Sequence, residues 1–428
     1  MPNAHPPTTS SDVIVVGAGA AGLSAARRLA DAGLDVRVLE ARDRLGGRLH
    51  TRHDLAGVPV ELGAEFMHTA ANPLRPVLRA AGFEERRGVS SHLPSESFRP
   101  RLESFLAASC TPEESISVEA LVQRHATDAP AAQLLEEAFG AQRGREELRR
   151  TSATDAMHEL ELELADDEFM GEHNFRLPAG WGTVVDHLAQ GLHCETGRRV
   201  EHIGIEAGGI VVEAVGENGP LQYRAEQLIV TVPLGVLKNG DIQFTPALPA
   251  EKSAAIQAMT TLDILKLVFV FDGDVWTFDS PVQQTRPSPS TWWHSTWDGA
   301  PRDETVIVGW AVGDEARRML QEPPEVMTAR AAASLSAMLG RPDHPPRTAT
   351  FHSWGADPFT RGSYSHVPPG APRDIRDRLA MPTGDRIFWA GEATAAFRSR
   401  TVGGAYASGA RAAAEVLDAR SRLVEAAS

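Results

Sequence analysis

The 428-residue sequence has only two cysteines, Cys110 and Cys194, and no CxxC pair. Two thiols cannot build a disulfide framework, which is typical of proteins in a reducing compartment. The sequence also lacks an apolar run of about 18 residues, so no membrane-spanning helix is expected. Its start, MPNAHPPTTSSD, has neither the basic nor the apolar segment of a secretory leader. These absences together predict a cytoplasmic protein.

Positive charge is scarce as well, because 42 Lys and Arg face 57 Asp and Glu, which gives a formal net charge of −15. Such a surface repels phosphate backbones, so nucleic acid is not an expected partner. Fifteen histidines include His50 and His53, but there is no HExxH motif, no Cys/His cluster and no GxSxG elbow. We therefore expect no metal site, and we interpret the acidic stretch ELELELADDE, residues 159–168, as a solvated face.

The most informative segment is VIVVGAGAAGLSAARRLADAGLDVRVLE, residues 13–40. A short apolar strand over residues 12–16 is followed by Gly17, Gly19 and Gly22 in GxGxxG spacing and then by a helical pattern. In such a motif the first glycine permits a tight turn, the second admits a pyrophosphate and the third lets the helix pack close to the strand. Glu40 ends the second strand, where a carboxylate can accept the hydroxyls of a ribose.

Two further glycine turns lie far apart in the sequence. Gly46-Gly47-Arg48 follows the second strand, where a cofactor longer than a nicotinamide dinucleotide would need another close approach of the backbone. In isolation, this turn could equally be a surface loop with a solvated arginine. Near the other end, a strand over residues 386–390, a turn at Gly391-Glu392 and an Ala-rich helix follow one another. That helix alone would fit ordinary packing.

Taken together, these segments resemble the flavin-containing amine oxidases, a superfamily of monoamine oxidases, polyamine oxidases and histone lysine demethylases. The resemblance extends to LIVTVPLGVLKNGDIQFTPALPAEKSAAI at residues 228–256 and to SWGADPFTRGSYSHVPPG at residues 353–370. Residues 82–171 carry no motif of this kind. The resemblance implies an FAD cofactor that is wrapped by segments from both ends of the chain.

A lysine in an apolar strand is the clearest chemical signal outside the glycine turns. In TLDILKLVFVFDGDVW, both faces of the expected strand are apolar, so Lys266 is expected to be buried. An unpaired buried ammonium costs several kcal/mol or loses its proton, so such a lysine is a candidate for function. In the family that the chain resembles, a lysine in this setting holds a water near flavin N5. The alternative is a lysine that reaches solvent at the strand end.

The resemblance also assigns side chains around the flavin ring. Ser363 stands where monoamine oxidases attach the flavin to a cysteine, so FAD is expected to be non-covalent. Tyr364 matches one of their two ring-side tyrosines, whereas Thr401 replaces the other. Trp354 is a ring-side candidate that could equally be core. The expected catalytic residues are Lys266, Tyr364 and Trp354.

Two side chains of the segment ELGAEFMHTAANPL, Glu65 and His68, could meet a cationic substrate group or belong to a solvated loop. Arg75 lies late for a clamp on a substrate carboxylate, which disfavours an amino-acid substrate. The residues expected to bind FAD come from all these segments. They are Gly17, Gly19, Ala21, Gly22, Glu40, Ala41, Arg42, Gly46, Gly47, Arg48, Gly63, Ala64, Glu65, Phe66, Val200, Gly391, Glu392, Thr401, Val402 and Ala405.

The expected fold class is α/β, with a discontinuous, doubly wound, Rossmann-like FAD domain and an α+β substrate domain with a helical insertion. We place the FAD domain at residues 10–85, 195–245 and 383–420, the helical part of the substrate domain at 86–194, and a mixed sheet carrying Lys266 at 246–382.

The resemblance implies oxidation of a small-molecule amine to an imine that water hydrolyses to a carbonyl compound, while O2 is reduced to H2O2. The alternatives are another FAD oxidoreductase, such as an L-amino-acid oxidase, a desaturase or a protoporphyrinogen-oxidase-like enzyme, and a non-catalytic FAD-binding protein. The identity of the amine and the oligomeric state do not follow from the sequence.

Overall fold

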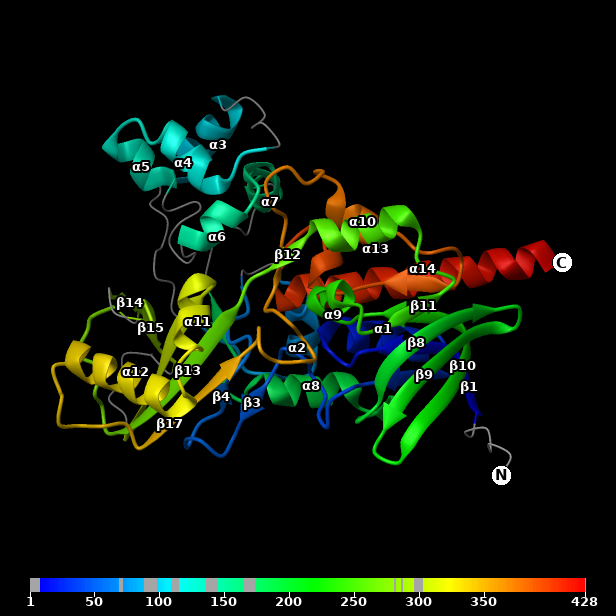
Figure 1. The fold of residues 1–428 in the computed structure, drawn as a ribbon, viewed down its shortest axis with the longest axis horizontal. Helices are drawn as coiled ribbons and strands as arrows, with labels where there is room; N and C mark the ends of the chain where they lie inside the picture. The colour runs from blue at the N-terminus through cyan, green and yellow to red at the C-terminus, as the bar shows by residue number, and fades with distance from the viewer. Residues whose placement is uncertain are drawn as a thin grey trace.

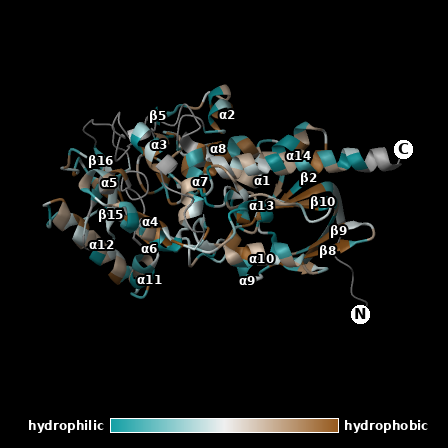
Figure 2. Ribbon diagram, turned by 90° about the horizontal axis from the view of Figure 1, so that it is seen from above, coloured by the Kyte–Doolittle hydropathy of each residue, from teal (hydrophilic) through white to brown (hydrophobic). Residues whose placement is uncertain are grey.

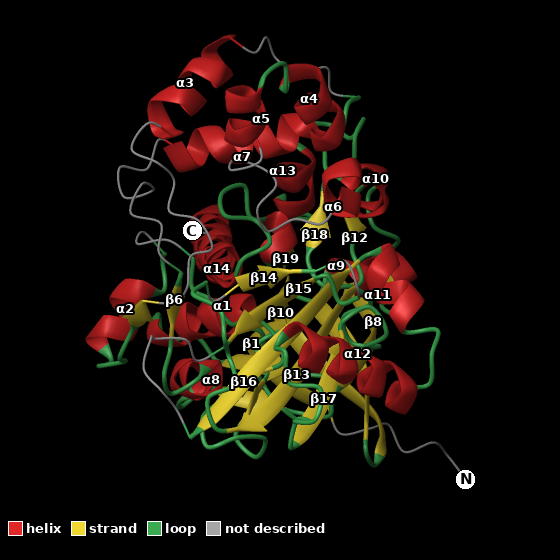
Figure 3. Cartoon of the chain, turned by 90° about the vertical axis from the view of Figure 1, so that its left-hand side faces the viewer, coloured by secondary structure: helices red, strands yellow, loops and turns green. Residues whose placement is uncertain are grey.

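The computed structural model shows three parts that meet around one cavity (Figure 1). A large sheet contains both the first strand and the strand that precedes the last helix, a second sheet lies beside it, and a group of helices lies to one side (Figure 3). The structure describes residues 8–68, 72–87, 98–108, 115–135, 145–164, 174–280, 282–285, 288–295 and 303–427.

The large sheet has eight strands in the order β11-β8-β9-β10-β1-β2-β7, with β19 also pairing with β10. β10 is parallel to β1 and β19, β1 is parallel to β2, and β2 is parallel to β7, whereas β8, β9 and β10 form an antiparallel meander. The expected doubly wound α/β fold is therefore confirmed. The strands are β1 (Thr8–Val16), β2 (Val36–Leu39), β7 (His193–Glu195), β8 (Arg199–Glu206), β9 (Gly209–Gly216), β10 (Gly219–Val230), β11 (Gln243–Thr245) and β19 (Ile387–Trp389).

Helices α1 (Ala20–Asp31), α8 (Trp181–Ala189) and α14 (Val402–Ala427) pack on one face of the parallel strands. α1 and α14 approach closely at Gly409, where a Cβ atom would lie 2.0 Å from the backbone oxygen of Ala21. Two segments almost 400 positions apart therefore form one layer over the sheet. In Figure 2 the hydrophobic colours gather on the strands around β10, beneath these helices.

The second sheet has five strands in the order β14-β15-β16-β13-β17. It was expected to be mixed, and this expectation is wrong, because every neighbouring pair is antiparallel. A helical crossover does join two parallel strands, β16 and β17, but β13 lies between them. Helices α11 and α12 of that crossover cover the face that carries Leu265 and Phe269. The bounds are β13 (Ile264–Asp272), β14 (Val282–Gln284), β15 (Thr291–His294), β16 (Glu304–Val312), β17 (Thr348–Ser353), α11 (Asp314–Met319) and α12 (Pro324–Met338).

The helical part has a small core of its own around Leu102, Leu121 and Met157. Its helices are α3 (Phe98–Ala108), α4 (Val118–His125), α5 (Ala129–Leu135), α6 (Arg145–Arg150) and α7 (Ala153–Leu164). The remaining elements join the three parts. They are β3 (Thr51–Arg52), β4 (Val60–Glu61), α2 (Arg75–Ala80), β5 (Arg86–Arg87), β6 (Phe175–Arg176), α9 (Leu234–Asn239), α10 (Ala250–Ala258), β12 (Thr260–Thr261), β18 (Ser365–His366), α13 (Ile375–Ala380) and the 3₁₀ helix η3 (Glu392–Thr394).

Two elements of the range 86–194, which we had assigned to the helical part, lie with the large sheet. α8 packs beside α1, and β7 pairs with β2 at residues 37–39. Apolar positions such as Val184 and Leu188 explain this placement, because they extend the core beneath α1. Of the two cysteines, Cys194 lies in β7, and Cys110 lies outside the described residues. No helix in the described ranges is long and apolar enough to cross a membrane.

Candidate functional site

One cavity of about 800 Å³ runs between the two sheets and reaches the helical part. This volume is in the upper range for small-molecule sites. Every residue that the sequence assigned to the cofactor or to catalysis lines this cavity, with the single exception of Gly22. Segments from positions 16 to 405 therefore meet at one site.

Gly22 is needed for helix packing rather than for the cavity wall. A Cβ atom at this position would lie 1.9 Å from the backbone oxygen of Gly17, at the turn between β1 and α1. Gly17 itself has a φ of +103°, and a Cβ there would lie 2.7 Å from Oγ1 of Thr231. These two positions keep the turn tight enough for the first residues of α1 to line the cavity.

Two helix N-termini reach the cavity, and together they test whether a dinucleotide fits. Gly19 caps α1 without a side-chain hydrogen bond, and the first turn of this helix contains no acidic residue. At α14, Thr401 Oγ1 accepts a hydrogen bond from Gly404 N at 3.0 Å, while Thr401, Val402 and Ala405 line the wall. Because helix N-termini favour anions, this cradle fits a pyrophosphate.

The carboxylate of Glu40 is placed as the motif predicts. Its Oε2 accepts a hydrogen bond from Ala18 N at 2.9 Å, and its Oε1 accepts one from Arg42 N at 2.9 Å. Each oxygen can accept a further hydrogen bond, so the carboxylate can also receive ribose hydroxyls. Glu40 is buried at the carboxyl end of β2 and lines the cavity.

The second glycine turn is joined to the first. Gly46 N donates to Ala18 O at 2.9 Å, and Gly46 bridges to Gly19 in parallel. Next to it, Arg48 Nη1 donates to Oε1 of Glu392 at 2.9 Å. Oε2 of that carboxylate accepts from Ser365 Oγ at 2.7 Å. The turn near residue 47 and the turn near residue 391 are therefore joined by the Arg48–Glu392 ion pair, and both line the cavity.

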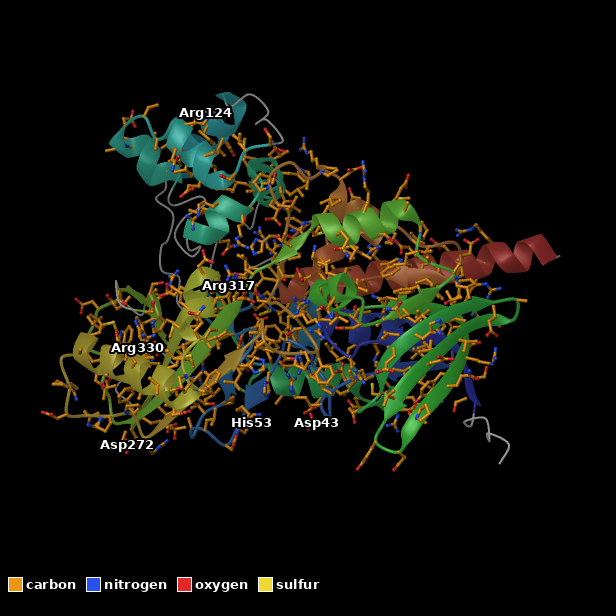
Figure 4. All side chains as sticks on the ribbon, in the orientation of Figure 1. Asp43, His53, Arg124, Asp272, Arg317 and Arg330 are labelled. Carbon is orange, nitrogen blue, oxygen red and sulfur yellow. The ribbon has the colours of Figure 1, made fainter. Side chains whose placement is uncertain are left out.

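Lys266 is fully buried in β13, so the alternative that it reaches solvent is wrong. Asp272, the last residue of β13, lies at the outer rim (Figure 4), which places Lys266 at the inner end of this strand. Its Nζ donates to Oε2 of Glu65 at 2.9 Å and to Gly63 O at 3.1 Å. The lysine is therefore half of a buried ion pair.

Glu65 binds donors from three other positions besides Lys266. Its Oε2 accepts from Trp293 Nε1 at 3.0 Å, its Oε1 accepts from Ser295 Oγ at 2.7 Å, and the guanidinium of Arg176 lies 2.8 Å from Oε1. The expectation of a solvated loop is wrong for Glu65, because this residue is buried among these groups, whereas its contact with a cationic substrate group stays a prediction.

The family follows from comparison with known proteins. The chain matches the flavin containing amine oxidoreductase family over residues 20–103 and 95–417. Polyamine oxidase 2 of Arabidopsis thaliana is 32% identical over 459 residues, which cover 98% of this chain and 90% of that protein. The chain belongs to the flavin-containing amine oxidases. It is an FAD-dependent amine oxidoreductase.

Other relatives agree with this assignment. Lysine-specific histone demethylase 1 homolog 1 of Arabidopsis thaliana is 32% identical over 95% of this chain, which spans 52% of that relative. Among solved structures, wild-type putrescine oxidase bound to putrescine has a TM-score of 0.78 at 22% identity, with 96% of this chain and 100% of that chain covered. The structural likeness shows that the fold is shared.

Aromatic rings form the wall of this flavin enzyme near Lys266. Trp293 lies with its ring centroid 6.1 Å from that of Phe66 and 5.6 Å from that of Trp310. Trp354 is buried and donates from Nε1 to Leu62 O at 3.1 Å, and Tyr364 also lines the cavity. The sequence analysis named Phe66, Trp354 and Tyr364 and missed the two tryptophans of the second sheet, because only strand pairing brings them beside Lys266.

Several charged residues of the cavity were also missed. Arg398 and Arg400 line the cavity, and both are non-glycine residues with positive φ, of 54° and 66°. Glu159 contacts Arg400 and Ser399 and is buried at the wall. The reading of residues 159–168 as a solvated face is therefore wrong at Glu159, and residues 165–168 lie outside the described residues. A buried acid on a helix gives no local signal, because its partners follow more than 200 positions later.

Of the remaining candidates, His68 lies in the cavity wall, whereas Arg75 and His53 do not. His68 lines the cavity, and its Nδ1 lies 2.7 Å from Asn174 Oδ1. Burial lowers the pKa of His68, so its ring is disfavoured as a cation. Arg75 is outside the cavity wall and forms an ion pair with Glu85 at 2.8 Å. His53 is exposed and lies at the lower rim of Figure 4, away from the wall.

Proposed function

We propose that this protein is an oxidase that converts a small-molecule amine to an imine, which water hydrolyses to a carbonyl compound, with O2 as electron acceptor. FAD would be held by the glycine turns near Gly19, Gly47 and Gly391, and it would supply the redox chemistry, which is acceptance of a hydride equivalent from the C–H bond beside the nitrogen and transfer of two electrons to O2, with two protons, to give H2O2. The chain's own residues bind, orient and exclude water around that reaction.

One observation carries this proposal. The buried Lys266 lies in the same cavity wall as the glycine turns at residues 17–22, 46–48 and 391. A desaturase or a purely structural FAD site gives no reason to bury a lysine at this point. In the proposed enzyme, Lys266 donates a hydrogen bond to a water molecule or to oxygen inside the cavity.

The wall beside Lys266 suits a neutral amine. Phe66, Trp293, Trp310 and Tyr364 present aromatic surface there, and an apolar wall disfavours the ammonium form of a substrate. Amine oxidation starts from the uncharged nitrogen, so this wall favours the reactive form. Polyamine oxidase 2 and putrescine oxidase, by their names, act on aliphatic amines. The proposed substrate class is therefore a small-molecule amine whose reacting end becomes neutral in the cavity.

FAD is proposed to be held without a covalent bond. Ser363, which stands at the attachment position of monoamine oxidases, donates from Oγ to Leu262 O at 2.9 Å. A serine hydroxyl does not form the thioether that a cysteine forms there. Acid precipitation should release all the yellow colour into the supernatant, and colour that stays in the pellet contradicts this part of the proposal.

The decisive experiment is an anaerobic screen in which amines are mixed with the purified holoenzyme and the absorbance of oxidised flavin is followed. The panel contains aliphatic diamines, polyamines, aromatic monoamines, secondary amines and L-amino acids. We expect bleaching by at least one amine, and production of H2O2 when air is admitted. Bleaching by amino acids alone would favour an L-amino-acid oxidase, although Arg75 does not line the cavity. If no compound bleaches the flavin, the catalytic proposal fails.

A further inference from the structure

Lys266 directs one of its N–H groups into the cavity because two acceptors take the others. An ammonium carries three N–H groups and no lone pair. Among the described residues, Nζ contacts two acceptors, the carboxylate of Glu65 at 2.9 Å and Gly63 O at 3.1 Å. The third N–H is left for the cavity that Lys266 lines.

The protonation state of Lys266 decides whether its side chain presents a hydrogen-bond donor or a lone pair to the cavity. A neutral amine has only two N–H groups, and both would be donated to Glu65 and Gly63. It would then turn its lone pair to the cavity and could act as a base. The ammonium instead presents a donor and a positive charge. Both states make the same hydrogen bonds to Glu65 and Gly63. They differ in what Lys266 presents to a molecule in the cavity, which is a positive donor in one state and a lone pair in the other.

Glu65 is built to remain a carboxylate. Burial by itself would raise its pKa, but the charges of Lys266 and Arg176 outweigh this effect and hold the pKa below its usual value. Hydrogen bonds from Ser295 and Trp293 stabilise the same ionised form. An ionised carboxylate 2.9 Å away favours the ammonium form of its partner.

Further titratable groups surround this pair. Arg176 in β6 brings a second cation to the single carboxylate of Glu65, so the three groups together are positive. Glu61 in β4 is close enough to interact electrostatically with Lys266. His352 in β17 is the cross-strand partner of Lys266. Any pH experiment on the pair must separate these groups from Lys266.

We propose that Glu65 is a positioning residue that keeps Lys266 in the ammonium form with one N–H directed into the cavity. Lys266 is then a fixed donor and positive charge during turnover, and not a base. The effect on turnover rests on the proposed oxidase function, whereas the charge state of Lys266 does not. Glu65 acts through Lys266 and needs no contact with the substrate.

The first test measures the midpoint potential of bound FAD from pH 6 to pH 10 in four proteins: wild type, Glu65→Gln, Lys266→Met and the double variant. Glu65→Gln should show an additional pH-dependent shift to lower potential, because the carboxylate that stabilises the ammonium of Lys266 is gone. The shift should be absent in the wild type and in both proteins with methionine at position 266. The comparison with Lys266→Met removes Glu61, His352 and Arg176 as causes, since all three remain in place.

The second test is a double-mutant cycle on the rate of flavin reduction by the amine that the screen identifies. Glu65→Gln should slow reduction at least about tenfold in the wild-type background at high pH and leave the Lys266→Met background unchanged. Ser295→Ala is the matched control, because it removes a donor to Glu65 without changing a charge. It should slow reduction by less than about threefold, and Glu65→Asp should restore most of the wild-type pH profile.

Two results overturn the proposal. Equal slowing by Glu65→Gln in both backgrounds, with a potential curve parallel to that of the wild type, would make Glu65 a packing residue. An ionisation below about pH 9 that the wild type shows and Lys266→Met lacks would mean that Lys266 is not held as an ammonium. This second comparison holds even if Glu65→Gln fails to retain FAD. If no amine is oxidised, the proposed function fails, but the potential curves still test the pair.

Discussion

The two ends of the cavity are built in different ways. The end near Gly17 and Gly46 is made of backbone turns and helix N-termini, and its backbone approaches join Gly22 to Gly17 and Gly46 to Ala18 within the first segment of the chain. The end near Lys266 is made of side chains, and its central contact joins residues 201 positions apart. The first end depends on the absence of side chains, and the second depends on pairing them correctly.

This difference separates binding from reactivity. A change at the backbone end blocks the space that the cofactor needs, so it removes FAD. A change at the side-chain end leaves that space intact, so it alters what the bound cofactor can do. Substitutions at both ends therefore test whether the backbone end controls FAD binding and the side-chain end controls reactivity.

The largest effect is expected for Gly22→Ala. The new Cβ would lie 1.9 Å from Gly17 O, so α1 must move away from the turn and the anion site at its N-terminus is lost. We expect protein that is purified without FAD and does not take it up. The ratio of flavin to protein absorbance measures this. Gly208→Ala is the control, because nothing lies within 4 Å of its added Cβ, and it should bind FAD normally.

Lys266→Met should have the next largest effect, on rate alone. The loss of a preorganised donor typically slows catalysis by about 10²–10³-fold. FAD should stay bound, since Arg176 still balances Glu65. Stopped-flow measurements of flavin reduction and reoxidation give the two half-reactions separately. Wild-type rates in both would remove Lys266 from the mechanism, and loss of FAD would erase the distinction between the two ends.

Glu40→Gln should weaken FAD binding without affecting the chemistry. The variant loses a charged acceptor for Ala18 N and Arg42 N, and hydrogen bonds to charged groups are worth about 1.5–3 kcal/mol. The dissociation constant of FAD should rise roughly 10- to 100-fold. Titration of the apoprotein with FAD measures this, and the rate of flavin reduction at saturating FAD should stay near the wild-type value. A large fall in that rate would show that the two ends are coupled.

The smallest effect is expected at Glu61, which is buried beside Thr51 and Trp181 and is not part of the cavity wall. Burial raises its pKa to about 7, while the N–H of Trp181 and the hydroxyl of Thr51 partly offset this rise. Between about pH 4.5 and pH 7 the folded state binds this proton and the unfolded state does not, so this group makes stability fall as pH rises through that window. Glu61→Gln removes the dependence.

The difference in unfolding temperature between the Glu61→Gln variant and the wild type should therefore move in favour of the variant from pH 5 to pH 8. The expected change is a few degrees, on the order of 1–3 kcal/mol in stability. Thermal unfolding of both proteins across this range measures it. A constant difference would mean that Glu61 is already ionised in the folded state at pH 5.

The sequence predicts the backbone end well because its signals are local. Gly17, Gly19 and Gly22 follow a strand and open a helix, and their spacing alone indicates the turn. At the other end, the two apolar faces of the strand predict that Lys266 is buried but not what it contacts. Glu65, Trp293 and Arg176 reach it only through loops and strand pairing, and no periodic pattern records these contacts.

The same limit explains two of the corrections. The acid at Glu159 looked solvated because its partner, Arg400, lies in a distant turn with positive φ. The second sheet was expected to be mixed, whereas every neighbouring pair of its strands is antiparallel. The structure inserts β13 between β16 and β17, and the order of strands in space cannot be derived from their order in the chain.

The contact between α1 and α14 has a consequence for biosynthesis. Because α14 residues between Val402 and Ala419 pack in one core with α1, a growing polypeptide cannot complete its nucleotide cradle until the ribosome has translated nearly all of it. The flavin must therefore be acquired late, after the second sheet and the helical part have emerged. A premature stop codon before residue 402 should leave a product that contains Lys266 and its partners, yet is colourless.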